Sequence, residues 1–143
     1  MKRISFFPIS LAILVLGLFS LGYSERGIQV QEKRFALVIG NGSYKSSPLR
    51  NPTNDAHDMA LVLKTLGFEV THLENAEYRA MERAIRKFGK QLRNRDAGLF
   101  YFAGHGVQVN GRNYLIPVDA EIETESDVKF EAVDAGRVLG KME

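Results

Sequence analysis

A histidine between two glycines, Gly104-His105-Gly106, is the feature of this sequence that points most directly to chemistry. An imidazole exchanges a proton near neutral pH, so His105 is a candidate general base. Because the flanking glycines carry no side chain, we expect the backbone to turn sharply there and a substrate to approach it. The N–H of Gly106 is then a candidate donor toward an oxyanion. An ordinary loop histidine between two turn glycines remains the alternative interpretation.

No cysteine is present in the 143 residues, so a histidine base has no thiol to activate within this sequence. Ser126 is the only serine after His105, and it lies in an acidic segment. A histidine and an oxyanion donor without a nucleophile leave only residual activity. We therefore expect these residues by themselves to carry out no nucleophilic catalysis.

The elements that position His105 follow an alternating pattern. Short apolar runs at 34–40, 68–73 and 98–103 are typical of strands, and apolar residues at helical spacing separate them. This order predicts an α/β fold with a parallel sheet, right-handed crossovers and helices on its faces. The carboxyl ends of parallel strands share one edge, so the loop at 41–54 and Gly104-His105-Gly106 should meet at one site.

Local signals predict where several of these elements begin and end. Asn51 followed by Pro52 favours a helix start capped by the asparagine side chain. The second helix carries one apolar stripe, and Asn110-Gly111 predicts a tight hairpin turn. Residues 117–127 are expected to be irregular, and 131–142 to form one final helix.

The first 24 residues are set apart from the domain. A short basic start precedes an uncharged segment from Ile4 to Ser24, which is typical of a secretory signal peptide cut after Ser24. We therefore expect an exported protein, periplasmic or secreted, with residues 1–24 as signal, 25–33 as linker and 34–143 as the domain. The alternative is an uncut membrane anchor at residues 4–24, the one case in which we expect contact with a membrane.

Charge and motif spacing argue against several other classes of site. Lys2 and Arg3 carry the formal net charge of +2, so the remainder is balanced and we expect no nucleic-acid partner. A glycine-rich nucleotide turn after the first strand lacks its third glycine. Asp55, His57 and Asp58 do not share one helix face, so we expect no metal site and no cofactor. His57 and His72 are interpreted as histidines without a special role.

Four segments in order resemble the caspase-like cysteine peptidases, and most closely the bacterial group near metacaspases and paracaspases. They are RFALVIGNGSY at 34–44, LRNPTNDA at 49–56, LGFEV at 66–70 and FYFAGHG at 100–106. The resemblance runs from Arg34 to about Gly140. It implies a three-layer α/β sandwich with a mostly parallel sheet and an endopeptidase activity on peptide or protein substrates.

The resemblance also implies roles for individual residues. His105 matches the catalytic histidine that acts with a cysteine thiolate, and Gly106 matches the oxyanion donor. Asp55 matches an acidic group in a pocket for a substrate arginine or lysine, which Ala103 would also line. Arg50 keeps the opposite specificity open, since some relatives bind aspartate through an arginine in this loop. A simple helix-start acid remains the alternative for Asp55.

The chain departs from the family in its nucleophile. Relatives carry the cysteine on the next strand, roughly 50 residues beyond the histidine, whereas 38 residues without a cysteine follow His105 here. We therefore expect the C-terminal strands to be missing and one edge of the histidine-bearing strand to be exposed. Two functions stay open: the N-terminal portion of an endopeptidase domain, or a non-catalytic binding or regulatory module that partners an intact caspase-like relative.

Overall fold

The computed structural model describes residues 7–13, 32–92 and 96–142. Its elements in chain order are β1 (Phe7–Ile13), β2 (Arg34–Gly40), α1 (Pro52–Thr65), β3 (Glu69–Glu74), α2 (Tyr78–Gln91), β4 (Ala97–Val109), β5 (Arg112–Leu115), α3 (Val128–Glu131), β6 (Val133–Asp134) and α4 (Ala135–Leu139).

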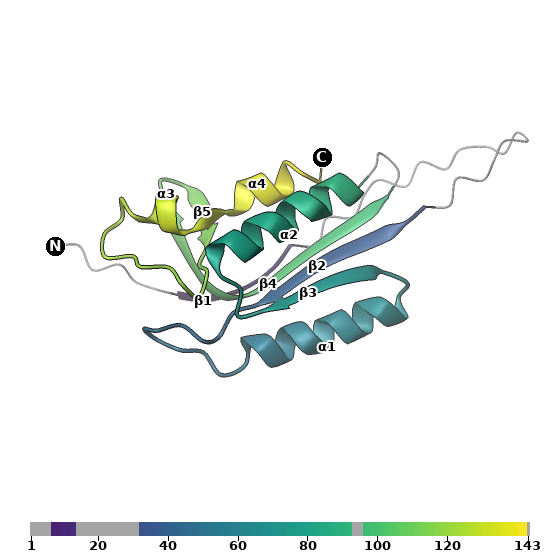
Figure 1. Ribbon diagram of the computed structural model, residues 1–143, viewed down its shortest axis with the longest axis horizontal. Helices are drawn as coiled ribbons and strands as arrows, with labels where there is room; N and C mark the ends of the chain where they lie inside the picture. Colours follow the sequence, from purple (N-terminus) through teal and green to yellow (C-terminus); the bar gives the residue numbers. More distant parts are fainter. Residues whose placement is uncertain (1–6, 14–31, 93–95, 143) are drawn as a thin grey trace, which may run out of the picture.

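The strands form one mixed sheet between two helical layers, with α1 on one face and α2 and α4 on the other (Figure 1). Along the sheet the order is β3-β2-β4-β5-β6, and β1 pairs with β4 outside this path. The central strands β3, β2 and β4 are parallel, whereas β1, β5 and β6 pair antiparallel with their neighbours. The expected three-layer α/β fold is confirmed.

Strand β2 is the centre of the core, and its residues after Arg34 are all buried. Leu37 and Ile39 pack toward α2, whereas Ala36 and Val38 pack toward α1. A strand covered on both faces is apolar without alternation, which explains the unbroken run seen in the sequence. The predicted stripe of the second helix is confirmed, since Met81, Ala84, Ile85 and Phe88 are buried on α2.

Two of the predicted helix boundaries need correction. Helix α1 begins at Pro52 as predicted, but Asn51 has helical backbone angles and its side chain makes no capping hydrogen bond. The single helix expected over 131–142 is divided, because Ala132 is extended and Val133 pairs with Leu115 of β5. Asp134 then caps α4 by accepting a hydrogen bond from the N–H of Gly136 at 2.8 Å.

The predicted hairpin is confirmed. Val109 of β4 pairs with Arg112 of β5, and both turn residues have positive φ, 48° for Asn110 and 76° for Gly111. These are the backbone angles that a two-residue hairpin of this kind requires, and asparagine and glycine adopt them most readily.

The expectation of an exposed edge on β4 is not met over residues 100–106. β1 pairs antiparallel with this stretch, from Phe7 opposite Gly106 to Ile13 opposite Phe100. β1 lies inside the predicted signal peptide, whose other residues fall outside those that the structure describes. Among the described residues, no helix is both long enough and apolar enough to cross a membrane.

A buried asparagine joins the carboxyl end of β2 to two distant segments. The side chain of Asn41 is fully buried, and its Nδ2 donates to the carbonyl oxygens of Ala76 and Ile116, each at 3.2 Å. Its Oδ1 accepts from the N–H of Ala76 at 2.8 Å. Because one amide satisfies three backbone groups, it fixes the start of α2 and the end of β5 against β2.

Replacing Asn41 by alanine should leave the buried N–H of Ala76 without its acceptor, and should remove one of the two donors to each of the carbonyl oxygens of Ala76 and Ile116. We expect Asn41→Ala to lower the free energy of unfolding by about 2–4 kcal/mol, measured by urea denaturation. Asn54→Ala, at an exposed position of α1, is the matched control and should change stability by less than about 0.5 kcal/mol. Equal losses in the two variants would contradict the role assigned to Asn41.

Candidate active site around His105

His105 lies inside a strand, not in a loop after it. β4 continues without interruption from Ala97 to Val109, and His105 is its ninth residue and is 7% exposed. The expected sharp turn at the two glycines is therefore wrong, because β1 and β5 pair with the second half of β4 and keep it extended. A strand holds a side chain in place more firmly than a mobile loop does.

The two partners of β4 on one edge meet at His105. β2 pairs with β4 as far as Ala103, and β5 pairs with it from Gly106 onward. At the junction, the carbonyl oxygen of His105 accepts from the N–H of Ile116 at 3.0 Å. The N–H of His105 makes no direct hydrogen bond to the carbonyl oxygen of Ile116, because a side-chain hydroxyl lies between these two groups.

That side chain is Tyr44, from the loop after β2. Its hydroxyl accepts from the N–H of His105 at 2.9 Å and donates to the carbonyl oxygen of Ile116 at 3.0 Å. The hydroxyl therefore replaces one rung of the β4–β5 ladder. Burial of the phenol raises the pKa of Tyr44 to about 12, although the hydrogen bonds to His105 and Asn41 lower it in part.

Two contacts orient the imidazole ring itself. Nε2 of His105 lies 2.7 Å from the carbonyl oxygen of Ser47, and the ring centroid lies 4.5 Å from that of Tyr44. A carbonyl oxygen only accepts, so Nε2 carries the hydrogen and, in the neutral ring, Nδ1 carries the lone pair. Ser47 has a φ of 57°, an uncommon angle for serine, and this conformation presents its carbonyl to His105.

The first glycine of the motif makes room for Tyr44. A Cβ atom at Gly104 would lie 2.6 Å from the Tyr44 hydroxyl and 2.8 Å from Cζ of Phe102. Neither distance is tolerated, so only glycine lets the tyrosine reach the strand. Gly104 thus serves the close approach of a side chain, and its φ is not positive.

The second glycine presents its backbone to the other edge of β4. Along a strand, successive residues direct their N–H and C=O groups to opposite edges. The carbonyl oxygens of Ala103 and His105 face the edge of β2 and β5, because they accept hydrogen bonds from the backbone N–H groups of Asn41 and Ile116, respectively. Gly106 therefore faces the β1 edge, where it lies opposite Phe7.

The predicted substrate-binding residues lie near the same end of the sheet. Ala103 is buried under α1, two residues before His105 on the same face of β4. Asp55 is exposed in the first turn of α1, and its charge adds to burial in raising the pKa of Tyr101, which packs beside Ala103. Arg50 is exposed in the loop between Ser47 and α1. The structure thus brings Asp55 and Ala103 to the face of the sheet that α1 covers.

Sequence reasoning assigned no role to Tyr44 or Ser47, although they hold His105. The available signal was a large aromatic residue in a loop of small polar ones, which is typical of a side chain that returns to the core. Ser47 gave no signal, because its contribution is a backbone carbonyl.

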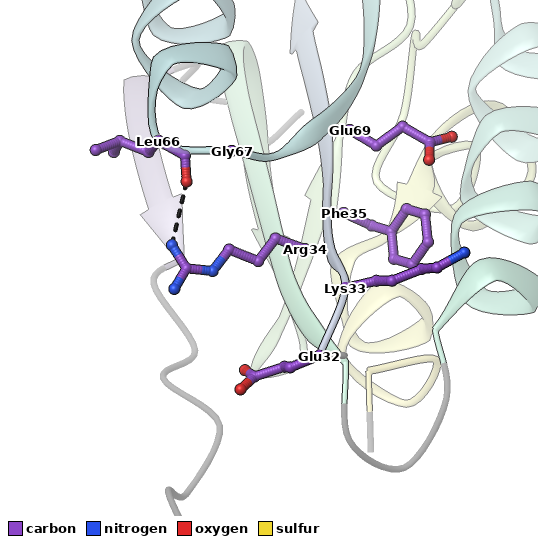
Figure 2. Close-up of a pocket in the computed structure, with 7 residues that line it drawn as sticks. All are labelled: Glu32, Lys33, Arg34, Phe35, Leu66, Gly67 and Glu69. Atoms are coloured by element: carbon purple, nitrogen blue, oxygen red, sulfur yellow. Dashed lines mark hydrogen bonds between the residues drawn. The ribbon is translucent and has the colours of Figure 1, made fainter. Parts of the chain in front are cut away.

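A groove elsewhere in the molecule is separate from this site. Figure 2 shows its lining, which includes Lys33, Arg34 and Glu69, and the hydrogen bond of 3.1 Å from Arg34 to the carbonyl oxygen of Leu66. These residues lie at the amino ends of β2 and β3. Gly40, the last residue of β2, lies opposite Ala103 of β4, two residues before His105. His105 is therefore near the carboxyl ends of these strands, and the groove is at their opposite ends.

The buried phenol predicts a loss of stability in alkali. In the unfolded chain Tyr44 ionises near pH 10, whereas in the folded protein it keeps its proton to about 12. The stabilisation is therefore complete below pH 10 and is lost as the pH rises to about 12. A shift of this size corresponds to roughly 2–3 kcal/mol.

Urea denaturation of the wild type and Tyr44→Phe at pH 9 to 12 measures this contribution. The wild type should lose more stability over that range than the variant, in which the ionisable group is absent. The pKa of Tyr101 is also raised by burial, but Tyr101 is present in both proteins and its effect cancels in the difference. Parallel losses in the two proteins would show that Tyr44 does not titrate in this way.

Comparison with known proteins agrees with this architecture. The model of the caspase domain matches residues 33–141. The human mucosa-associated lymphoid tissue lymphoma translocation protein 1 is 35% identical over 88 residues, which are 61% of this chain and 11% of that protein. Its mouse homologue is 34% identical over 97 residues, 67% of this chain and 12% of the relative. The chain spans only about a tenth of the relatives' length, but the caspase-domain match covers most of it, and the chain belongs to the caspase domain family.

Proposed function

We propose that this chain is the histidine-bearing part of a caspase-like cysteine endopeptidase domain acting on peptide or protein substrates. The observation that carries the proposal is the pairing of two groups at one point of β4. The ring of His105 is oriented by Ser47 and Tyr44, and the next residue, Gly106, presents its backbone to the β1 edge. A general base and an oxyanion donor are thus adjacent on a rigid strand.

The chemistry assigned to these groups follows from their atoms. Nδ1 of His105 takes the proton of a cysteine thiol, and the thiolate attacks the substrate carbonyl carbon. The N–H of Gly106 stabilises the resulting oxyanion, and the imidazolium returns the proton to the leaving amine. This chain has no cysteine, so the thiolate must come from polypeptide outside these 143 residues.

The β1 edge of β4 is where such a polypeptide would pair. A strand that brings a thiolate next to Gly106 needs the edge that β1 occupies over Phe100–Gly106, so the two strands are alternatives. Export with removal of residues 1–24, as the sequence predicts, would also remove β1 and open this edge. In this proposal, processing of the N-terminus and completion of the site are linked.

The absence of cysteine favours a second candidate, a non-catalytic caspase-like module that binds another chain through the same edge. A backbone edge with unpaired donors and acceptors accepts an added strand without any catalytic group. The two candidates differ in one respect. Only the first gains peptidase activity when the missing nucleophile is supplied.

Supplying the nucleophile tests the proposal. The chain as given should cleave neither arginine nor aspartate reporter peptides above a His105→Ala control. A protein in which the cysteine-bearing segment of a close relative follows Glu143, with residues 1–24 deleted, should become active. His105→Ala should abolish that activity, because no other group accepts the thiol proton.

Two outcomes of this experiment are decisive. Activity in the unmodified chain would contradict the mechanism, since it contains no thiolate. A folded fusion without activity, in which the cysteine still reacts with an alkylating probe, would favour the binding module.

Specificity provides a separate prediction for the active fusion. If Asp55 binds a basic side chain, arginine or lysine should be preferred before the scissile bond. Asp55→Asn should then lower kcat/KM for an arginine peptide by about 10- to 100-fold, the usual value of a charged hydrogen bond. Asp58→Asn, an exposed acid on the same helix, is the matched control and should have little effect. A preference for aspartate, lost in Arg50→Gln, would move the specificity role to Arg50.

A further inference from the structure

A cluster of metal-binding side chains lies outside the site around His105. It consists of His57 from α1 and of His72 and Glu74 from β3. Each residue offers one ligand atom, and these atoms all lie within 4.8 Å of one another. The sequence suggested no such cluster, because fourteen residues separate His57 from His72 and its helical neighbours Asp55 and Asp58 point elsewhere.

The fold brings the three residues together in a simple way. His72 and Glu74 are two apart on β3, so their side chains lie on the same face of the sheet. His72 is opposite Val38 of β2, and Val38 packs under α1. The face is therefore the one that α1 covers, and His57 on α1 meets His72 across it with ring centroids 6.1 Å apart.

The spacing fits a tetrahedral ion. Two ligands bound to zinc at about 2.1 Å in tetrahedral geometry lie roughly 3.4 Å apart. Nε2 of His72 and Oε1 of Glu74 are 3.5 Å apart, so these two atoms already have that separation. The ligand atom of His57 lies within 4.8 Å of both, and because this side chain is exposed it has room to move toward them.

The condition of His72 also suits a ligand. Its Nε2 is buried and makes no hydrogen bond within the described part of the chain. Burial lowers the pKa of His72, as do the neighbouring His57 and Lys64, whereas Glu74 raises it.

We propose that His57, His72 and Glu74 bind a divalent transition-metal ion, with zinc as the best fit, and leave a fourth position open to water. Two imidazoles and one carboxylate suit zinc, whereas calcium and magnesium prefer oxygen ligands throughout. His57 and Glu74 are exposed, so the ion has a path from solvent. The positive charge of Lys64 on α1 repels a cation at this position, and the negative charge of the Glu74 carboxylate offsets that repulsion.

An ion at this position would tie α1 to the edge strand β3. It would also lie next to the loop that holds His105, because Glu74 precedes Asn75. Oδ1 of Asn75 accepts from the N–H groups of Gly42 and Ser43, each at 2.9 Å, in the loop that carries Tyr44 and Ser47. A ligand that binds only the folded chain stabilises it in proportion to the logarithm of its concentration above Kd.

The test uses the full chain freed of any affinity tag and stripped of metal, titrated with zinc ion alone in a calorimeter. We expect one zinc per chain and a rise in Tm with zinc that EDTA reverses. His57→Ala and Glu74→Gln, both at exposed positions, should each weaken binding by at least about tenfold and remove most of the rise in Tm. Cobalt ion in place of zinc should give the visible absorption of a tetrahedral site, and both variants should lose it.

Two matched controls show whether binding belongs to this cluster. Glu69→Gln removes an exposed carboxylate of β3 outside the cluster, and should bind zinc as the wild type does. His105→Ala removes the remaining histidine of the chain and should also leave binding unchanged. Binding that survives in His57→Ala, is lost in His105→Ala, or is absent from the wild type at millimolar zinc would overturn the proposal. None of these outcomes bears on peptidase activity.

Discussion

The hydroxyl of Tyr44 is the contact on which the geometry of the candidate active site depends. β4 has two successive partners on one edge, β2 as far as Ala103 and β5 from Gly106 onward. Where one partner gives way to the other, a backbone N–H and a carbonyl oxygen would be left without their rung. The phenol bridges them: it gives the buried N–H of His105 an acceptor, so that this N–H does not pay a desolvation cost, and it donates beside Asn41 to the buried carbonyl oxygen of Ile116. The same ring packs against His105.

The start of the loop that supplies Tyr44 is held by the side chains of Asn41 and Asn75. Asn41 bonds to segments before α2 and after β5, and Asn75 accepts from Gly42 and Ser43. These contacts let a loop of small polar residues present the Ser47 carbonyl at a defined place. His105 is therefore fixed from three sides, by its own strand, by the aromatic ring and by the serine carbonyl. Such support is what a catalytic histidine needs to keep one tautomer and one orientation.

The two edges of β4 have different tasks. The edge shared by β2 and β5 holds the sheet together, and the hydroxyl bridge belongs to it. The other edge receives the backbone groups of Gly106 and pairs with β1. Because strand residues alternate between edges, the histidine can be anchored on one side while the next residue faces the other. Adjacent residues thus provide a well-anchored imidazole and a backbone group that faces the β1 edge.

The sequence by itself predicted the central strands and the two long helices, their order and the α/β class, because strand and helix periodicities and turn chemistry are local properties. It did not predict β1, or the strand β6 that divides residues 131–142. The run at 34–40, the stripe of α2 and the Asn110-Gly111 turn needed no knowledge of the rest of the chain. It also marked His105 and Gly106 as candidate site residues, since a glycine-flanked histidine after an apolar run is visible locally. The length of β4 could not be predicted from the local sequence, because its continuation past Ala103 depends on pairing with β1 and β5. Only the tertiary structure brought Tyr44 and Ser47 to His105, and His57 to His72 and Glu74. Those contacts join residues far apart in the chain through sheet register and helix packing, which no local pattern encodes.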